Sequence, residues 1–142
     1  MKQVTETPRI LVVDDDMDLL MLLERRLLKE GFEVESAASL REAEEYIQLF
    51  KPHLLVLDVN VAGEDGRKLS AKLKIEGAST KIVVISGYDY SAARAALFGA
   101  DELVPKPINT DYLIFVINKH LYGEQAAGIA YRWAITEGKT PN

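Results

Sequence analysis

The stretch Leu54-Leu55-Val56-Leu57-Asp58 decides the fold of this chain. Four consecutive apolar residues end at a single carboxylate, and the polar, glycine-containing segment Val59–Gly66 follows. A short apolar run bounded by polar and glycine residues is typical of a strand buried on both faces. Asp58 then lies at the C-terminal end of that strand, and open parallel sheets bind their ligands outside these ends. The stretch therefore predicts a functional carboxylate at one edge of a parallel sheet.

The same arrangement, an apolar run that ends in polar residues, recurs elsewhere in the chain. Arg9–Val13 is followed by three aspartates, Lys81–Ile85 by a serine and a glycine, and Glu102–Val104 by Pro105-Lys106-Pro107. A further segment, Phe32–Ala38, alternates apolar and acidic residues, which predicts a strand nearer the sheet edge. Together with the stretch before Asp58, these segments make five predicted strands.

Between the strands, apolar residues recur at the spacing of amphipathic helices. The predicted helices are Met17–Lys29, Leu40–Phe50, Arg67–Glu76, Ser91–Phe98 and Asp111–Leu121. The apolar positions of the first are Met17, Leu20, Met21, Leu23, Leu27 and Leu28. Asp16 is a candidate N-cap for this helix, and Ser39 with Glu42 forms a capping box for the next. The alternation predicts an α/β fold, a (βα)5 doubly wound parallel five-stranded sheet with helices on both faces.

Size, charge and composition limit the function. A chain of 142 residues is long enough for one domain and a short appendage. Its net charge of −5 argues against direct nucleic-acid binding, and the absence of cysteine excludes disulfides and thiolate metal sites. Met1–Pro8 is polar, so no signal peptide is predicted, and no apolar run reaches the roughly 20 residues of a membrane span. We expect a cytoplasmic domain over residues 9–122, preceded by a disordered N-terminus over residues 1–8.

Five polar side chains are expected to meet at the C-terminal edge of the predicted sheet: Asp14, Asp15, Asp58, Ser86 and Lys106. Three carboxylates in one place repel one another unless a cation lies between them, and their oxygens suit Mg²⁺ or Mn²⁺. A hydroxyl and an ammonium group beside them suit the oxygens of a phosphoryl group. A carboxylate can itself be the nucleophile and form an aspartyl phosphate. These residue types point to transfer of a phosphoryl group onto Asp58.

With these motifs in this order, the sequence closely resembles the receiver domain of two-component response regulators. The resemblance covers about Ile10–Leu121. It rests on the motifs Ile10–Asp16, Asp58–Gly66, Ser86-Gly87 and Lys106-Pro107. It implies a flavodoxin-like and CheY-like three-layer sandwich. It also implies a phosphoacceptor that signals through protein–protein contacts and is not an enzyme beyond its own phosphorylation and dephosphorylation.

The resemblance implies a role for each residue that matches the family motifs. Asp58 would be the phosphoacceptor. Asp15 would bind Mg²⁺ directly, Asp14 would bind it through water, and Asn60 would offer its main-chain carbonyl. The donor would be a phosphohistidine on a sensor histidine kinase or a phosphotransfer protein. A downstream protein target or an output domain would respond to the phosphorylated state, and a homodimer is a further partner to consider.

The same resemblance implies that Ser86 and Lys106 hold phosphoryl oxygens, and that the Lys106–Pro107 peptide is cis, as is common in this family. Three positions depart from the family pattern, and one of them is Pro105, which precedes Lys106 and stiffens the approach to Pro107. Val61-Ala62 replaces a frequent Met-Pro pair, so we expect a looser loop there. Leu103 stands where the family often has an aromatic switch residue, so the usual rotamer change of a ring is not expected. Tyr88 is expected to cover the acyl phosphate and slow its hydrolysis, unless its side chain points to solvent.

Other classes of protein share parts of this pattern. A degenerate receiver, acting as a phosphorylation-independent interaction module, would lack the acceptor or the acidic pair, and this chain keeps both. A haloacid-dehalogenase-like phosphatase also uses Asp, a hydroxyl, Lys and Mg²⁺, but its nucleophile follows the first strand and its chain is longer. A flavodoxin-like FMN-binding protein needs a phosphate loop of Ser, Thr and Gly after the first strand. Asp14–Asp16 occupy that place here and would repel the ligand.

The tail, residues 123–142, carries one apolar stripe at helical spacing, formed by Ala126, Ile129, Ala130 and Trp133. An isolated helix of this length is marginal in water. The predicted helix Glu124–Thr136 therefore has to dock on its own domain or on a second copy of the chain. The alternative is a frayed remnant of a linker.

Overall fold

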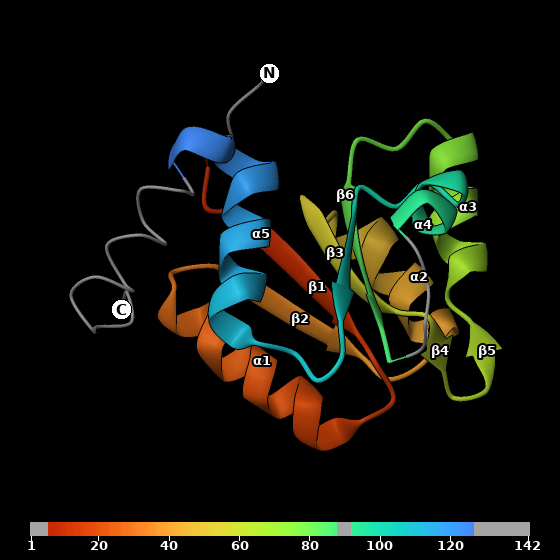
Figure 1. Ribbon diagram of the computed structural model, residues 1–142. Coiled ribbons are helices and arrows are strands. Elements are labelled where there is room, and N and C mark those ends of the chain that lie inside the picture. Colours follow the sequence, from red (N-terminus) through yellow and green to blue (C-terminus); the bar gives the residue numbers. More distant parts are fainter. Residues whose placement is uncertain (1–5, 88–91, 127–142) are drawn as a thin grey trace.

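The computed structural model describes residues 6–87 and 92–126. A parallel sheet of five strands runs through the centre in the order β2-β1-β3-β6-β7 (Figure 1). Its strands are β1 (Arg9–Val13), β2 (Glu33–Ala37), β3 (Leu54–Asp58), β6 (Lys81–Ser86) and β7 (Glu102–Pro105). The helices are α1 (Met17–Lys29), α2 (Leu40–Phe50), α3 (Arg67–Ile75), α4 (Ala92–Leu97) and α5 (Thr110–Tyr122). Each element agrees with its predicted segment to within one residue at either end.

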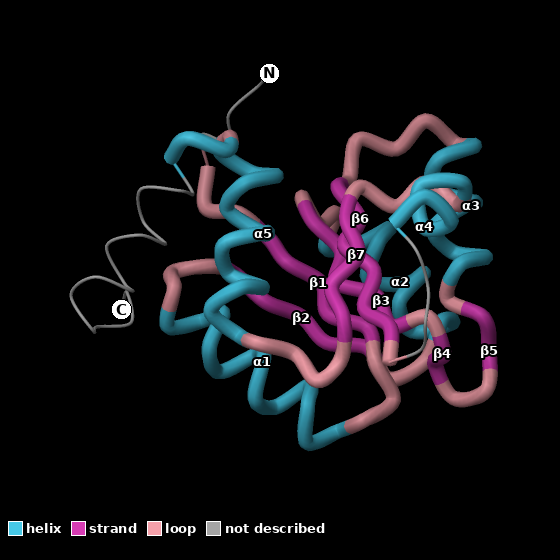
Figure 2. The backbone as a smooth tube through the Cα atoms, viewed as in Figure 1, coloured by secondary structure: helices cyan, strands magenta, loops and turns pink. Residues whose placement is uncertain are grey.

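Helices cover both faces of the sheet, as Figures 1 and 2 show. α1 and α5 lie on one face, and α2, α3 and α4 lie on the other. Because neighbouring residues of a strand point to opposite faces, Val56 packs in the cluster that includes Leu23 of α1, whereas Leu57 packs in the cluster that includes Leu69 of α3. β3 is buried along its whole length, as its unbroken apolar sequence predicts. The predicted doubly wound, three-layer α/β fold is confirmed.

Side-chain caps begin the first two helices at the predicted places. Asp16 Oδ1 accepts the N–H of Asp18 at 3.1 Å at the start of α1. Ser39 Oγ accepts the N–H of Glu42 at 3.1 Å, and the carboxylate of Glu42 accepts the N–H of Ala38 at 2.9 Å. These caps depend only on residues a few positions apart, so the sequence alone is enough to locate them.

The segment after β3 departs from the prediction. Asn60–Val61 (β4) and Glu64–Asp65 (β5) form a small antiparallel hairpin, where the sequence predicts a loop looser than in the family. Ala62 and Gly63 make its turn with φ values of 51° and 83°. Two left-handed residues in succession are typical of a two-residue hairpin turn. Val61 is fully buried and anchors the hairpin to the domain, so the segment is an ordered hairpin and not an irregular loop.

α1 leaves part of its apolar surface exposed. The residues of α1 buried in the core are Leu20, Leu23 and Leu27. The other members of the predicted stripe are exposed, namely Met17, Met21 and Leu28. The spacing of apolar residues therefore predicts the helix correctly but overestimates how much of it the domain covers.

The first described residues contact the domain, although the sequence predicts disorder up to residue 8. Glu6 accepts a hydrogen bond from Arg9 Nη1 at 3.2 Å, and its other oxygen lies 3.1 Å from Nε2 of His53. At the other end, residues 124–126 are helical. The rest of the predicted tail helix, and Tyr88, lie outside the described residues. In the described part of the chain, no helix is long and apolar enough to cross a membrane.

An ionic contact ties β7 to α5. The carboxylate of Glu102 on β7 lies 2.6 Å from Nζ of Lys119 and 3.0 Å from Nε2 of His120, both on α5. Burial acts to raise the pKa of Glu102, but the hydrogen bonds from Lys119 and His120 outweigh it and lower this pKa below its usual value of 4.5.

Replacing Glu102 by glutamine should lower the free energy of unfolding at pH 7 by about 1 kcal/mol. Because the folded pKa is lowered, the charged carboxylate stabilises the fold above pH 4.5, and this stabilisation is lost as the pH falls through the folded pKa. Urea unfolding of wild type and Glu102→Gln at several pH values checks this. The difference between the two proteins should shrink as the pH is lowered below 4.5. A constant difference at every pH would contradict it.

Gly66 marks a close approach of two backbone segments. A Cβ placed on Gly66 would overlap the main-chain oxygen of Asp58, and the N–H of Gly66 already donates to the carbonyl of Val59 at 2.6 Å. Gly66→Ala should therefore destabilise the domain by about 1–3 kcal/mol, as overpacking does elsewhere. Gly63→Ala is the control for side-chain volume, because nothing lies within 4 Å of its added Cβ, although its left-handed backbone adds some strain. Equal losses in the two variants, measured by thermal unfolding, would argue against the close-approach explanation.

Candidate functional site

A crevice lies at the C-terminal edge of the sheet, where the order of the strands reverses between β1 and β3. It has a volume of about 470 Å³. Its lining residues are Asp14, Asp15, Asp16, Asp58, Val59, Asn60, Ser86, Gly87 and Lys106. The loops after four different strands contribute to it, because parallel strands bring all their C-terminal ends to the same edge. All of the predicted site residues therefore lie in one crevice.

Three carboxylates converge in this crevice. Oxygens of Asp14, Asp15 and Asp58 lie within 4.8 Å of one another. Asp14 and Asp58 are buried at the ends of β1 and β3, whereas Asp15 is exposed. Hard oxygen ligands in such a cluster fit a divalent cation of the Mg²⁺ type, so the residues present can hold a metal ion. Asp16, the third aspartate of the run, caps α1 instead.

Lys106 reaches back from the end of β7 to the carboxylates. Its Nζ donates to Asp58 Oδ2 at 2.9 Å and to Asp14 Oδ2 at 3.2 Å. Its backbone N–H donates to the carbonyl of Ser86 at 2.9 Å, which holds the end of β7 against the end of β6. The Lys106–Pro107 peptide bond is cis, as the family resemblance implies. The ammonium group therefore lies between two carboxylates that would otherwise repel each other.

The environment of the site changes the protonation of two of its groups. Burial raises the pKa of Asp14, and the charge of Asp58 acts in the same direction, against hydrogen bonds from Asp16 and Lys106. For Lys106, burial acts to lower the pKa, but hydrogen bonds to Asp58 and Asp14 outweigh it and raise the pKa above its usual value. Lys106 therefore stays charged at neutral pH and offsets part of the negative charge of the cluster.

Asn60 and Ser86 complete the crevice. The N–H of Asn60 donates to Asp58 Oδ1 at 3.3 Å and Lys106 donates to Oδ2, so both oxygens of Asp58 accept hydrogen bonds from the protein. Ser86 is the last residue of β6 and is buried beside the register partner of Asp58, Ile85. A backbone N–H and an ammonium group thus contact one carboxylate in a crevice that Ser86 also lines, and donors of these kinds suit an oxyanion ligand.

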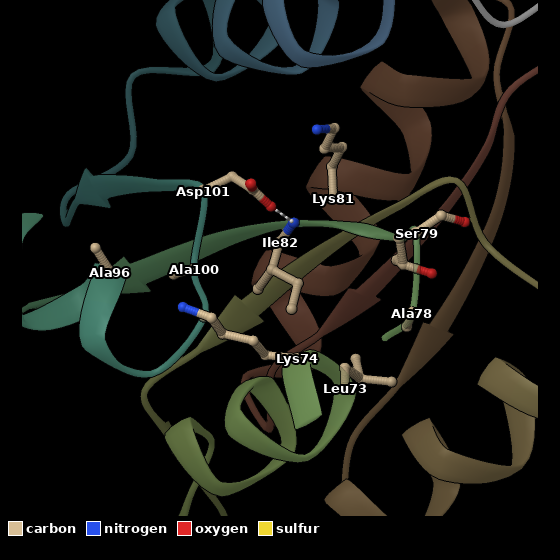
Figure 3. Close-up of a pocket in the computed structure, with 11 residues that line it drawn as sticks. Leu73, Lys74, Ala78, Ser79, Lys81, Ile82, Ala96, Ala100 and Asp101 are labelled. Carbon is tan, nitrogen blue, oxygen red and sulfur yellow. Dashed lines mark hydrogen bonds between the residues drawn. The ribbon is translucent and has the colours of Figure 1, made fainter. Parts of the chain in front are cut away.

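A second hollow of about 510 Å³ lies at the opposite, N-terminal edge of the sheet. Figure 3 shows it between the end of α3 and the start of β6. Asp101 lines this hollow, but its carboxylate accepts the N–H of Ile82 at 2.8 Å. This hydrogen bond gives the side chain a structural role at the start of β6. Among residues 6–87 and 92–126, the only cluster of metal-ligating side chains is the one at the C-terminal edge.

Comparison with known proteins identifies the family. A family model described as the response regulator receiver domain matches residues 10–118. The chain belongs to the response regulator receiver domain family. Response regulator MprA of Mycolicibacterium vanbaalenii is 37% identical over 108 residues, which are 75% of this chain and 47% of that protein. Protein PetR of Rhodobacter capsulatus is 31% identical over 112 residues, 78% of this chain and 47% of that protein. This chain therefore spans about half the length of these curated relatives.

Solved structures agree with this assignment. The receiver domain of NtrX from Brucella abortus aligns with a TM-score of 0.73 at 34% identity, covering 79% of this chain and 97% of that one. A response regulator signal receiver domain from Bermanella marisrubri aligns with a TM-score of 0.75 at 31% identity, covering 82% and 99%. The predicted membership of the receiver family is thus confirmed.

Sequence reasoning missed two features of the receiver site. The Asp-Gly pair at Asp65-Gly66 indicates a turn, but it does not reveal that Gly66 must lack a side chain because it contacts the backbone of Asp58. Nor does the sequence show that Asn60 belongs to a hairpin. A signal was present in Ala62-Gly63, since glycine in a short polar segment favours a left-handed hairpin turn.

Asp14→Asn should raise the free energy of unfolding at pH 7 by about 1 kcal/mol, because burial and Asp58 disfavour the charged form of Asp14 in the fold. The folded pKa lies above the unfolded value of 3.8, so ionisation costs stability as the pH rises through this interval. The variant keeps an oxygen that accepts the N–H of Asp16. Asp15→Asn is the control: it removes the same charge at an exposed position, where solvent screens the repulsion, and should raise stability by less. Loss of stability in Asp14→Asn at pH 7, measured by urea unfolding, would contradict this account.

Proposed function

We propose that this receiver domain accepts a phosphoryl group on Asp58 from a phosphohistidine donor, with the help of a divalent cation, and then changes its protein contacts. The observation that supports this most directly is the cluster of Asp14, Asp15 and Asp58, whose oxygens lie within 4.8 Å, with Lys106 Nζ 2.9 Å from Asp58. Nothing in a purely structural role would favour three carboxylates at one place, two of them buried.

The cation would be Mg²⁺ or Mn²⁺, held by Asp14, Asp15 and Asp58, with the main-chain carbonyl of Asn60 as a further ligand. Oxygen ligands of this kind suit both ions. When bound, the cation would neutralise charge on the carboxylates and on the incoming phosphoryl oxygens. Asp14 and Asp15 would thereby allow Asp58 to approach an anionic donor.

The chemistry itself would proceed on Asp58. One carboxylate oxygen attacks the phosphorus atom of the donor, and a phosphorus–oxygen bond forms as the phosphorus–nitrogen bond to the donor histidine breaks. The electron pair of the broken bond stays with the imidazole. Lys106, which donates to Asp58 Oδ2 in the structure, would donate to a phosphoryl oxygen of the product, and the hydroxyl of Ser86 would donate to another.

The partners follow from this chemistry. The donor would be a sensor histidine kinase or a phosphotransfer protein. Because the matched segment covers only 47% of each of these curated relatives, an output domain or a separate downstream protein would read the phosphorylated state. We assign the receiver to residues 9–122 and place it in the cytoplasm, where such donors act. A homodimer through the tail, residues 123–142, remains part of this proposal.

Incubation with acetyl phosphate and Mg²⁺ should add the mass of one phosphoryl group to the intact protein, and Asp58→Asn should abolish this. Asp15→Asn should slow the reaction by about tenfold or more, because it weakens metal binding. Asp16→Ala is the matched control: it removes the cap of α1 at a cost of about 1 kcal/mol but should retain phosphorylation.

The other outcomes assign the protein to other classes. A label retained in Asp58→Asn would show that another residue is the acceptor. A wild-type protein that takes no label would support the phosphorylation-independent interaction module. Continuous release of phosphate without accumulation of label would support a phosphatase.

A further inference from the structure

We propose that Arg67 is a positioning residue for the cation and phosphoryl site, acting through Asp65 on the backbone of Asn60. This inference rests on the proposed function, since it explains how the same site is held in shape. Arg67 itself lies on α3 and is absent from the set of residues that line the crevice.

The argument begins with Asn60, which carries out two tasks at the site. Its N–H donates to Asp58 Oδ1 at 3.3 Å, and its side-chain Oδ1 accepts the N–H of Gly63 at 3.1 Å. In the β4–β5 hairpin Asn60 is paired with Asp65. The orientation of the Asn60 backbone therefore sets both the hydrogen bond to Asp58 and the carbonyl that the proposed function offers to the cation.

The hairpin that holds Asn60 is small. Each strand has two residues, and a two-stranded hairpin on its own is marginally stable in water. Ala62 adopts a left-handed conformation that L-residues with a side chain rarely populate, and it is exposed together with Gly63 and Glu64. Val61 is the buried anchor on the first strand. The hydrogen bond from the N–H of Gly66 to the carbonyl of Val59 holds the end of the second strand, but Asp65, opposite Asn60, also needs a fixed direction if the position of Asn60 is to be well defined.

Arg67 fixes the direction of the Asp65 carboxylate. Its Nε lies 2.8 Å and 2.9 Å from the two oxygens of Asp65, and its Nη2 lies 2.6 Å from Oδ2. Asp65 Oδ1 also accepts the backbone N–H of Arg67 at 3.0 Å. The planar guanidinium group fixes the direction of a carboxylate as a lysine cannot. In agreement with this contact, the hydrogen bond from Arg67 lowers the pKa of Asp65.

The guanidinium group is itself held from the other side. Its central carbon lies 5.1 Å from the centre of the Phe98 ring, just beyond α4. The carbonyl of Phe98 accepts a hydrogen bond of 2.6 Å from Oγ of Ser70, which is fully buried on α3. A chain of contacts thus leads from Ser70 and Phe98 through Arg67 and Asp65 to Asn60.

Positioning and simple charge predict opposite effects on the cation. Arg67 is positive, so by Coulomb's law alone its removal would make a nearby acidic site bind a divalent cation more tightly. If Arg67 positions the hairpin, its removal should weaken binding, because the carbonyl and N–H of Asn60 lose their fixed direction. The sign of the change therefore separates the two roles.

The test compares Arg67→Met with Lys68→Met. Both variants remove one positive charge from neighbouring residues of α3, but Lys68 is exposed and makes no ion pair among residues 6–87 and 92–126. Mg²⁺ affinity is measured by following amide shifts in an NMR titration. We expect binding about three- to tenfold weaker in Arg67→Met, at or below the lower limit of outer-shell effects on metal affinity, because Arg67 acts through Asp65 and not on a ligand directly. Binding in Lys68→Met should be unchanged or slightly tighter.

A second measurement is independent of the metal. The N–H of Gly63 donates to the side chain of Asn60, so its hydrogen exchange, followed without Mg²⁺, reports on the hairpin. This exchange should become about threefold faster or more in Arg67→Met and should stay unchanged in Lys68→Met. Arg67→Lys keeps the charge and loses the planar fork, so it should resemble Arg67→Met. Thermal unfolding of each variant is the control that it is folded.

These measurements distinguish the possible failures. Unchanged Gly63 exchange, Mg²⁺ binding that is equal or tighter in Arg67→Met, or full restoration by Arg67→Lys would each overturn the positioning role. A wild-type protein that binds no Mg²⁺ would overturn the proposed function instead, and the exchange of Gly63 would still decide whether Arg67 holds the hairpin.

Discussion

The mutual repulsion of Asp14, Asp15 and Asp58 is the constraint on which the rest of the structure depends, because their oxygens lie within 4.8 Å of one another. Like charges at such a distance are unfavourable at any effective dielectric constant of a protein. Lys106 opposes part of this repulsion, and it reaches the cluster only because β7 ends at the same sheet edge as β1 and β3. The two apolar clusters on the faces of the sheet must stabilise a site that is unfavourable by itself.

Most of the fold was accessible from the sequence because it rests on local patterns. The apolar runs before Asp14 and Asp58 predict buried parallel strands, and caps such as Asp16 depend on neighbours a few residues away. The prediction failed where tertiary packing decides. Met17 and Met21 match the apolar spacing of α1 but lie beyond the contact with the sheet, and no local pattern shows where that contact ends.

The candidate site was predictable to the same extent and for a related reason. Residues at strand ends can be brought together from topology alone, which places Asp58 beside Lys106 although 48 positions separate them. Contacts between side chains of different elements follow no such rule. The sequence places Arg67 at the start of a helix, but only the structure shows its ring contact with Phe98 and its fork around Asp65.

The burial of β3 on both faces has a consequence for how the sheet finds its alignment. Leu57 pairs with Val13, so Asp58 lies level with Asp14 at the edge. If β3 shifted by one residue against its neighbours, each of its side chains would turn to the opposite face of the sheet. Both faces are apolar, so the four apolar side chains of β3 would still be buried, and hydrophobicity alone does not specify the alignment. A slip toward the interior would, however, carry Asp58 into the apolar layer, where an uncompensated charge is strongly unfavourable. The cost of burying Asp58 thus also opposes a shift in strand register. The side chain that would carry the chemistry therefore also helps to specify the alignment of the sheet.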